Sequence, residues 1–157
     1  MKISKILLFI NIAMLAFIWI FTGITYAGLP EIIPTHFLSN GSVDGESHKK
    51  VIWFLPSIAT FIFLILISIP RDPQSPMLNV PDSFRKRERL ELFSYTLSAP
   101  VLLMFADTVI ETVLITRGER QEPGSFIGIA LGLLFITLGT WIYIMIKEAR
   151  NPNFNRS

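Results

Sequence analysis

The chain has 157 residues, of which 51% are hydrophobic and only 17% are charged, and its formal net charge is +2. A soluble domain carries about 25% charged residues, so this composition excludes an ordinary soluble domain and indicates a membrane protein. The absence of cysteine excludes disulfides, thiolate metal sites and a cysteine nucleophile. The small net charge gives no support to nucleic-acid binding.

Four apolar segments are long enough to cross about 30 Å of hydrocarbon, which takes roughly 20 helical residues. They cover residues 6–27, 51–69, 92–116 and 126–146. Each must be helical, because a backbone amide inside lipid needs a partner within its own segment unless the chain forms a barrel. We therefore predict an all-α, polytopic membrane protein with four transmembrane helices. We expect the first to be retained, since a signal peptide has a shorter apolar core of about 7–15 residues.

Lys and Arg residues are unequally divided between the two ends of these helices. Ten lie in the N-terminal tail, the connection between the second and third spans, and the C-terminal tail. Only four lie in the other two connections. Because basic loops stay in the cytoplasm, we expect cytoplasmic N- and C-termini and an extracytoplasmic loop at residues 28–50.

This loop is too long for a simple link between two helices, for which about 2–8 residues suffice. Pro30 and Pro34 restrict the backbone at two points, and Asn40-Gly41 and Asp44-Gly45 are turn sequences. We expect the loop to adopt one shape over the outer ends of the helices. Gly41 is expected to need a positive φ, so Gly41→Val should damage folding.

The loop also carries a spaced motif of apolar, proline, aromatic and charged residues. The motif consists of Leu29-Pro30, Ile33-Pro34, His36-Phe37, Gly41, Asp44 and Lys49. Its pattern, LPxxIPxHFxxxGxxDxxxxK, resembles the domain of unknown function 1648, and the resemblance covers about the first 70 residues. That domain occurs in bacterial membrane proteins, including immunity proteins against the sporulation-delaying toxin. The resemblance implies a multi-pass protein of the bacterial inner or cytoplasmic membrane, with a role in toxin protection or signalling.

Three polar residues of the motif, His36, Asp44 and Lys49, are the candidate contact residues of the loop. His36 can exchange a proton near neutral pH and can bind a metal, and Asp44 and Lys49 can form an ion pair. Three roles are open: holding the loop together, contacting a ligand such as a peptide toxin, or, for His36 and Asp44, holding a metal with His48 and Glu46. We assign no metal and no cofactor, because the spacing matches no established metal-binding pattern.

The segment at residues 71–91 is rich first in proline and then in basic residues. The prolines prevent a regular helix at its start. We interpret the basic run as an orientation signal, with a contact to anionic lipid as the alternative. This cytoplasmic loop separates a first unit, residues 1–70, from a second helical hairpin with its tail, residues 92–157.

The third span holds the two charged residues of the four spans, Asp107 and Glu111, which share one helix face. A carboxylate inside a membrane costs roughly 2.5–3.5 kcal/mol on insertion scales and is a functional candidate. We expect an ion pair with Lys49, Lys50 or Arg117, which enter the membrane at the same level. The alternatives are a neutral carboxyl group and a proton or cation relay.

The fourth span contains a GxxxG step at Gly128 and Gly132, and Gly139 continues the same face. Small residues let another helix approach closely. We favour packing of this face within the bundle over dimerisation, because the motif is short and common.

From these features we expect a non-catalytic membrane protein whose extracytoplasmic loop contacts a ligand, in toxin immunity or membrane signalling. The alternative is a small transporter or channel subunit that uses Asp107 and Glu111. An intramembrane enzyme ranks last, because the sequence has no GxSxG or HExxH signature. The expected partners are the lipid bilayer and a peptide toxin or another membrane protein.

Overall fold

A computed structural model describes residues 2–38 and 42–150. Helix α1 (Ile3–Tyr26) is followed by strands β1 (Ile32–Phe37) and β2 (Val43–His48). The 3₁₀ turn η1 (Lys49–Trp53), helix α2 (Phe54–Ser68) and the turn η2 (Ile69–Arg71) come next. The turn η3 (Asp82–Phe84), helix α3 (Arg87–Thr116) and helix α4 (Phe126–Ala149) complete the described chain.

The four predicted helices are confirmed. Ile3–Tyr26, Lys49–Arg71, Arg87–Thr116 and Phe126–Ala149 are each long and apolar enough to cross a membrane. Their bounds differ from the predicted spans by at most five residues, because helices extend past the apolar run into its polar flanks.

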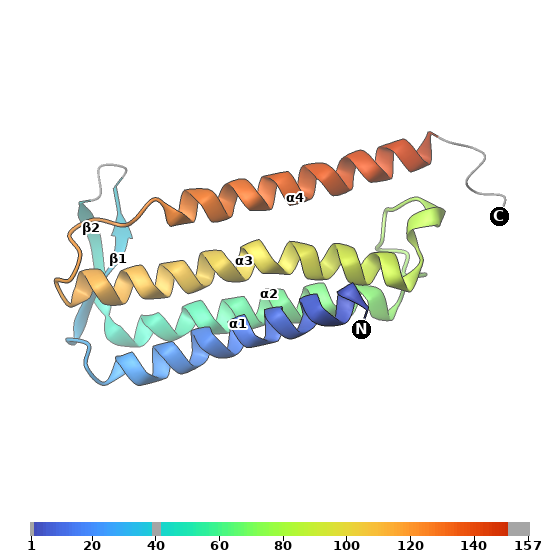
Figure 1. Cartoon of the computed structure of the whole chain (residues 1–157). Coiled ribbons are helices and arrows are strands. Elements are labelled where there is room, and N and C mark those ends of the chain that lie inside the picture. The colour runs from blue at the N-terminus through green and yellow to red at the C-terminus, as the bar shows by residue number, and fades with distance from the viewer. Residues whose placement is uncertain (1, 39–41, 151–157) are drawn as a thin grey trace.

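The helices lie side by side, with the two strands at one end of the bundle, which we call the hairpin end (Figure 1). Helix α3 packs against α1, α2 and α4, and eleven of its residues are buried. In α4 only Ala130 is buried. Helix α4 therefore lies at the edge of the bundle, and the other described elements leave most of its apolar surface uncovered.

The core of the bundle lies between the first three helices. Ile18 of α1 packs there with Ala59 and Phe63 of α2 and with Leu102 and Val109 of α3. All five are at most 5% exposed. This shared core fixes the directions of α1, α2 and α3 and leaves α4 outside it.

The end opposite the strands, which we call the basic end, comprises the start of α1, residues 69–86 and the end of α4. Here Glu148 of α4 accepts a hydrogen bond of 2.8 Å from the Ser83 hydroxyl and pairs with Arg89. The rings of Phe84 and Trp141 meet edge to face with centroids 5.5 Å apart. These contacts attach the last turns of α4 to η3 and to the first turn of α3.

Strands β1 and β2 form an antiparallel hairpin within the predicted loop, so the fold is mostly helical rather than all-α. Asp44-Gly45 lies inside β2, so its assignment to a turn is wrong. Asn40-Gly41 lies outside the described residues. Strand pairing satisfies backbone groups that an irregular loop would leave to water.

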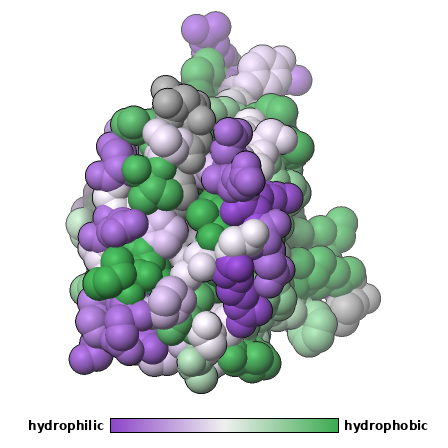
Figure 2. Space-filling view, turned by 90° about the vertical axis from the view of Figure 1, so that its left-hand side faces the viewer, coloured by the Kyte–Doolittle hydropathy of each residue, from purple (hydrophilic) through white to green (hydrophobic). Residues whose placement is uncertain are grey.

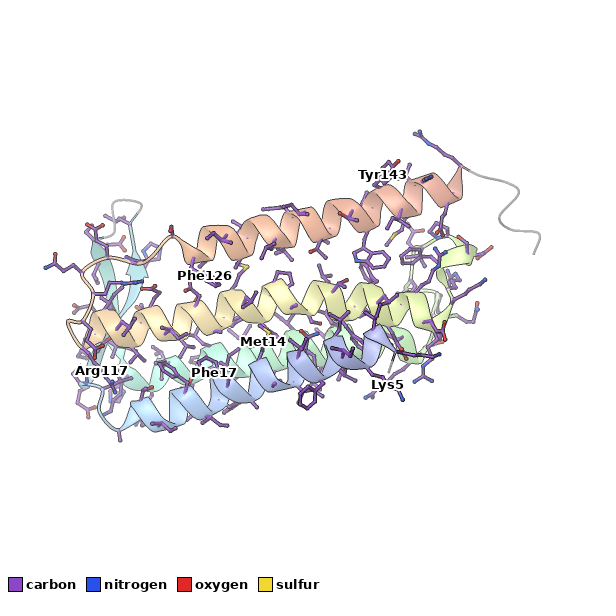
Figure 3. All side chains as sticks on the ribbon, in the orientation of Figure 1. Lys5, Met14, Phe17, Arg117, Phe126 and Tyr143 are labelled. Atoms are coloured by element: carbon purple, nitrogen blue, oxygen red, sulfur yellow. The ribbon has the colours of Figure 1, made fainter. Side chains whose placement is uncertain are left out.

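The glycine face of α4 points away from the bundle. A Cβ atom added at Gly128, Gly132 or Gly139 would meet nothing within 4 Å. The expected packing of these glycines inside the bundle is therefore wrong. Tyr143 of α4 likewise points away from the other helices (Figure 3). The same view shows Arg117 at the hairpin end and Lys5 at the basic end.

Candidate functional site

An apolar cluster fixes the hairpin to the helices. Leu29 and Ile33 pack with Ile52 of η1 and Val113 of α3, and each of the four is at most 3% exposed. Leu29 and Ile33 each precede a proline of the motif, which keeps them in an extended conformation. The two apolar-proline pairs of the motif thus set the base of the hairpin on the helix ends.

A polar network closes the base of the hairpin on its exposed side. The Glu31 carboxylate lies 2.9 Å from His48 Nε2 and 3.2 Å from Lys49 Nζ. Lys49 Nζ also donates a hydrogen bond to the Leu29 carbonyl at 3.1 Å. The backbone N–H of Lys49 donates to the Glu31 carbonyl at 2.8 Å. Because His48 Nδ1 accepts from the Lys50 amide, Nε2 carries the hydrogen that it donates to Glu31.

The hydrogen bond from Lys49 holds the pKa of Glu31 below its ordinary value of 4.5, and the positive charge of Lys49 adds to the effect. Lys49 also lies over the Tyr26 ring, with Nζ 5.4 Å from the centroid. Its side chain is only 17% exposed. The structure thus brings Lys49 to the end of α1 and the start of β1, rather than to Asp44.

Asp44 pairs with His36 instead, across the hairpin. Asp44 and Lys49, which we considered as a possible ion pair, thus have different partners. A Cβ atom added at Gly45, which is opposite His36 in the strand register, would lie 2.9 Å from His36 Cβ. That distance is shorter than real Cβ contacts, so only glycine lets the strands approach as they do.

The part of the hairpin that does not pack on the helices exposes apolar and polar side chains on both sides of its strands. We call this surface, carried by Ile32, His36, Leu38, Val43 and Asp44, the hairpin face. Ile32, Leu38 and Val43 are 52%, 47% and 40% exposed. The end-on view of the hairpin end shows hydrophobic patches between hydrophilic ones (Figure 2). Such a surface is suited to contact with an amphipathic partner.

The four residues considered for a metal site do not gather. His36 pairs with Asp44 while His48 pairs with Glu31, and no group of three or more His, Asp or Glu side chains converges within residues 2–38 and 42–150. A metal site needs three or four convergent ligands. The described part of the hairpin therefore holds ion pairs where a metal site was considered.

Glu111 of α3 pairs with Arg120, nine residues further along the chain. The pair forms because Gly118, with φ 73°, ends α3 in a left-handed conformation and turns the chain back. Glu111 Oε2 is buried without a hydrogen-bond partner among the described residues. Arg120 was not considered for this role, because it lies in the connection beyond the helix.

Asp107, one turn earlier in α3, is 9% exposed. The described residues offer it no hydrogen bond or ion pair, since Lys49 is bonded to Glu31 and Arg117 lies 4.0 Å from Glu119. The expected pairing of Asp107 with Lys49 or Arg117 is therefore wrong, and Lys50 does not pair with it either.

Sequence reasoning missed Glu31, His48 and Gly45 as structural residues of the hairpin. Glu31 and His48 are 17 residues apart and meet only through the register in which Ile32 is opposite His48. The signal that could have identified them is the alternation of side-chain direction along a strand around Ile33, which places neighbouring residues on opposite faces. That alternation is short and is interrupted by Pro34.

Comparison with known proteins bears directly on this hairpin. Residues 13–60 match the family model described as a domain of unknown function, DUF1648. An uncharacterised protein from the archaeon Archaeoglobus fulgidus is 33% identical over 114 residues, which cover 64% of this chain and 61% of that relative. No solved structure matches the chain. The match at residues 13–60 includes most of α1, the whole hairpin and the first part of α2, so the similarity to DUF1648 covers the region that carries the hairpin.

Proposed function

We propose that the protein binds a peptide ligand, such as a membrane-active toxin, on the hairpin face, and that it confers immunity or transmits a signal without catalysing a reaction. The proposal places it in a bacterial cytoplasmic membrane, with the hairpin outside and both termini in the cytoplasm. The observation that carries it is a hairpin whose base packs on the helices through Leu29 and Ile33 and whose remaining surface exposes both apolar and polar side chains.

A peptide is the favoured ligand because of the hairpin's chemistry. The hairpin has two strands, so each has one edge that is not paired within the described chain. An extended peptide can add to such an edge through main-chain hydrogen bonds, while its side chains contact the adjoining surface. Ile32, Leu38 and Val43 supply apolar contacts for that purpose.

His36 is the polar residue best placed to contact the ligand. An ionised carboxylate only accepts hydrogen bonds, so the Nδ1 atom that faces Asp44 carries a hydrogen. The ring therefore offers Nε2 for a further hydrogen bond, and its side chain is 70% exposed. Asp44 has the role of fixing the orientation of the ring.

Survival of toxin-treated cells tests this function. A bacterium sensitive to the sporulation-delaying toxin would express the wild-type chain, His36→Ala or Glu46→Gln, with membrane abundance measured in parallel. We expect the wild type and Glu46→Gln to protect, and His36→Ala to protect less at equal abundance. No protection by the wild type would contradict immunity, and a loss of abundance in His36→Ala would make His36 a structural residue.

A small transporter or channel subunit is the second candidate, and the unpaired carboxylate of Asp107 favours it. A folded Asp107→Asn variant that loses the cellular phenotype while His36→Ala keeps it would support this candidate over peptide binding. The opposite pattern would support the hairpin face. Both variants would be measured in the same survival assay.

A further inference from the structure

A cavity of about 630 Å³ lies between α1, α3 and the start of α4. Its lining is apolar except for Asp107: α1 contributes Phe9, Ile10, Ala13, Met14 and Phe17, α3 contributes Leu103, Ala106, Asp107 and Ile110, and α4 contributes Phe126. Its volume falls within the range of about 300–1,000 Å³ typical of small-molecule sites. The cavity is distant in sequence and position from the hairpin face.

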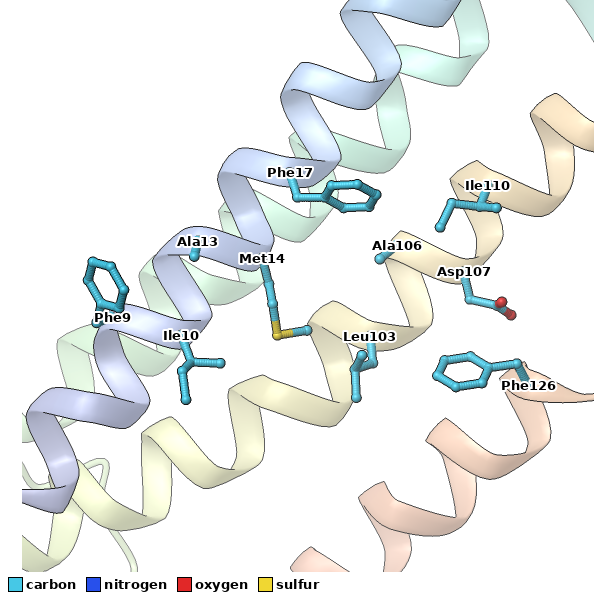
Figure 4. A pocket seen from close by; sticks show the side chains of 10 residues that line it. All are labelled: Phe9, Ile10, Ala13, Met14, Phe17, Leu103, Ala106, Asp107, Ile110 and Phe126. Carbon is cyan, nitrogen blue, oxygen red and sulfur yellow. The ribbon is translucent and has the colours of Figure 1, made fainter.

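The carboxylate of Asp107 is the polar group in this lining. The residue is 91% buried, as its exposed fraction of 9% implies. It projects from α3 on the side of Phe126 (Figure 4), and the described residues supply no hydrogen bond or ion pair to it. A buried ionised carboxylate without a partner is strongly unfavourable, so it must hold a proton or attract a cation.

Aromatic rings also line the cavity, and Phe126 lies beside Asp107 while Phe9 and Phe17 come from α1 (Figure 4). The faces of aromatic rings attract organic cations. A small inorganic ion needs several oxygen ligands, which the lining does not provide. One negative charge among aromatic and aliphatic side chains instead matches a single positive charge carried on an apolar body.

The rim of the cavity shows where such a molecule enters. Phe9 is 72% exposed and Phe17 is 45% exposed on the outer surface of α1, and Phe126 is 44% exposed at the start of α4. These residues lie on surfaces of candidate membrane spans. The cavity therefore opens sideways from the bundle, toward the region that lipid would occupy.

We propose that this lateral cavity binds an amphiphilic organic cation from the lipid phase, with Asp107 as its counter-ion and the phenylalanine rings around its apolar part. The site is independent of the peptide contact proposed for the hairpin face. Helix α4 contributes to the lining through Phe126, at its first turn. A lipid tail is the competing occupant, and it would need no charge.

Binding of radiolabelled tetraphenylphosphonium tests the proposal. The probe is measured on the full chain in phosphatidylcholine nanodiscs, with empty nanodiscs subtracted, and tetraphenylborate serves as an anion of the same shape. We expect saturable binding of the cation and none of the anion. Asp107→Asn should lower the affinity about tenfold or more, and Asp107→Glu should largely retain it.

Glu88→Gln is the control, because Glu88 is an exposed carboxylate at the other end of α3 and should leave the affinity unchanged. Thermal unfolding establishes that each variant is folded. Equal binding of cation and anion, no binding above empty nanodiscs, or wild-type affinity in folded Asp107→Asn would each overturn the proposal. The survival assay for the hairpin face does not depend on this result, so the two ideas can fail separately.

Discussion

Two carboxylates one helical turn apart in α3 have different surroundings. Glu111 meets Arg120, which the turn at Gly118 returns to the helix. Asp107 faces an apolar cavity. Breaking a buried ion pair leaves a charge without its partner, whereas removing an unpaired buried charge relieves an unfavourable burial. The two residues should therefore respond in opposite ways to neutral substitutions.

We expect Glu111→Gln to lower the free energy of unfolding by about 1.5–3 kcal/mol, the range for hydrogen bonds to charged groups. Asp107→Asn should leave it unchanged or raise it. Denaturation of both variants in the same detergent measures the difference. A larger loss in Asp107→Asn than in Glu111→Gln would show that Asp107 has a stabilising partner that its surroundings do not explain.

Gly45 provides a second test at the level of one residue. Gly45→Ala forces a new Cβ against His36 Cβ, and such overpacking costs about 1–3 kcal/mol. Gly128→Ala is the control, since its Cβ would meet nothing within 4 Å, and replacing a helical glycine by alanine is favourable. Thermal unfolding should thus separate the two variants. Equal midpoints would contradict the close approach of β1 and β2.

Among the structural elements, the helices were predictable and the hairpin was not. Long runs without charge decide the helices, because each run satisfies its own backbone in lipid. The strands have six residues each, and β1 contains Pro34. Their pairing depends on contacts of Leu29 and Ile33 with distant Ile52 and Val113, which no local pattern reveals. The loop motif nevertheless identified the region, since several of its residues form the hairpin base.

The hairpin base should weaken in acid. Because the pKa of Glu31 lies below 4.5 in the folded chain, its stabilising contribution is complete above pH 4.5 and is lost as the pH falls through the folded-state pKa. Melting temperatures measured from pH 6 downward should show this loss in the wild type. Glu31→Gln should melt at a lower temperature than the wild type above pH 4.5, and its melting temperature should fall less below that pH. Glu46→Gln should follow the wild type.

The attachment of α4 depends on its last turns. Trp141 Nε1 donates a 2.8 Å hydrogen bond to the Thr96 hydroxyl, and its ring meets Phe84. Replacing a fully packed core tryptophan by alanine costs about 3–5 kcal/mol. Trp141→Ala should lower the free energy of unfolding by up to this amount, and by less where lipid fills the space left by the ring. Tyr143→Ala, at a residue that is 65% exposed, should have little effect. Comparable losses in both variants would contradict this packing of α4.

At the scale of the whole molecule, the bundle separates two chemically different ends. The hairpin end lies in the region similar to DUF1648 and has a mixed surface, and the basic end carries most of the Lys and Arg residues. Positively charged segments favour the cytoplasm. The central claim, that a ligand reaches the hairpin face from outside the cell, therefore requires the hairpin end to face outward.

The most direct test is labelling of single cysteines with an impermeant thiol reagent, because the chain has no cysteine of its own. Ser42→Cys reports on the exposed hairpin, and Met77→Cys reports on the basic end, where Met77 is 91% exposed. We predict that Ser42→Cys reacts in intact cells and that Met77→Cys reacts only after lysis. Labelling of Met77→Cys in intact cells, with Ser42→Cys protected until lysis, would contradict the orientation and with it the proposed contact.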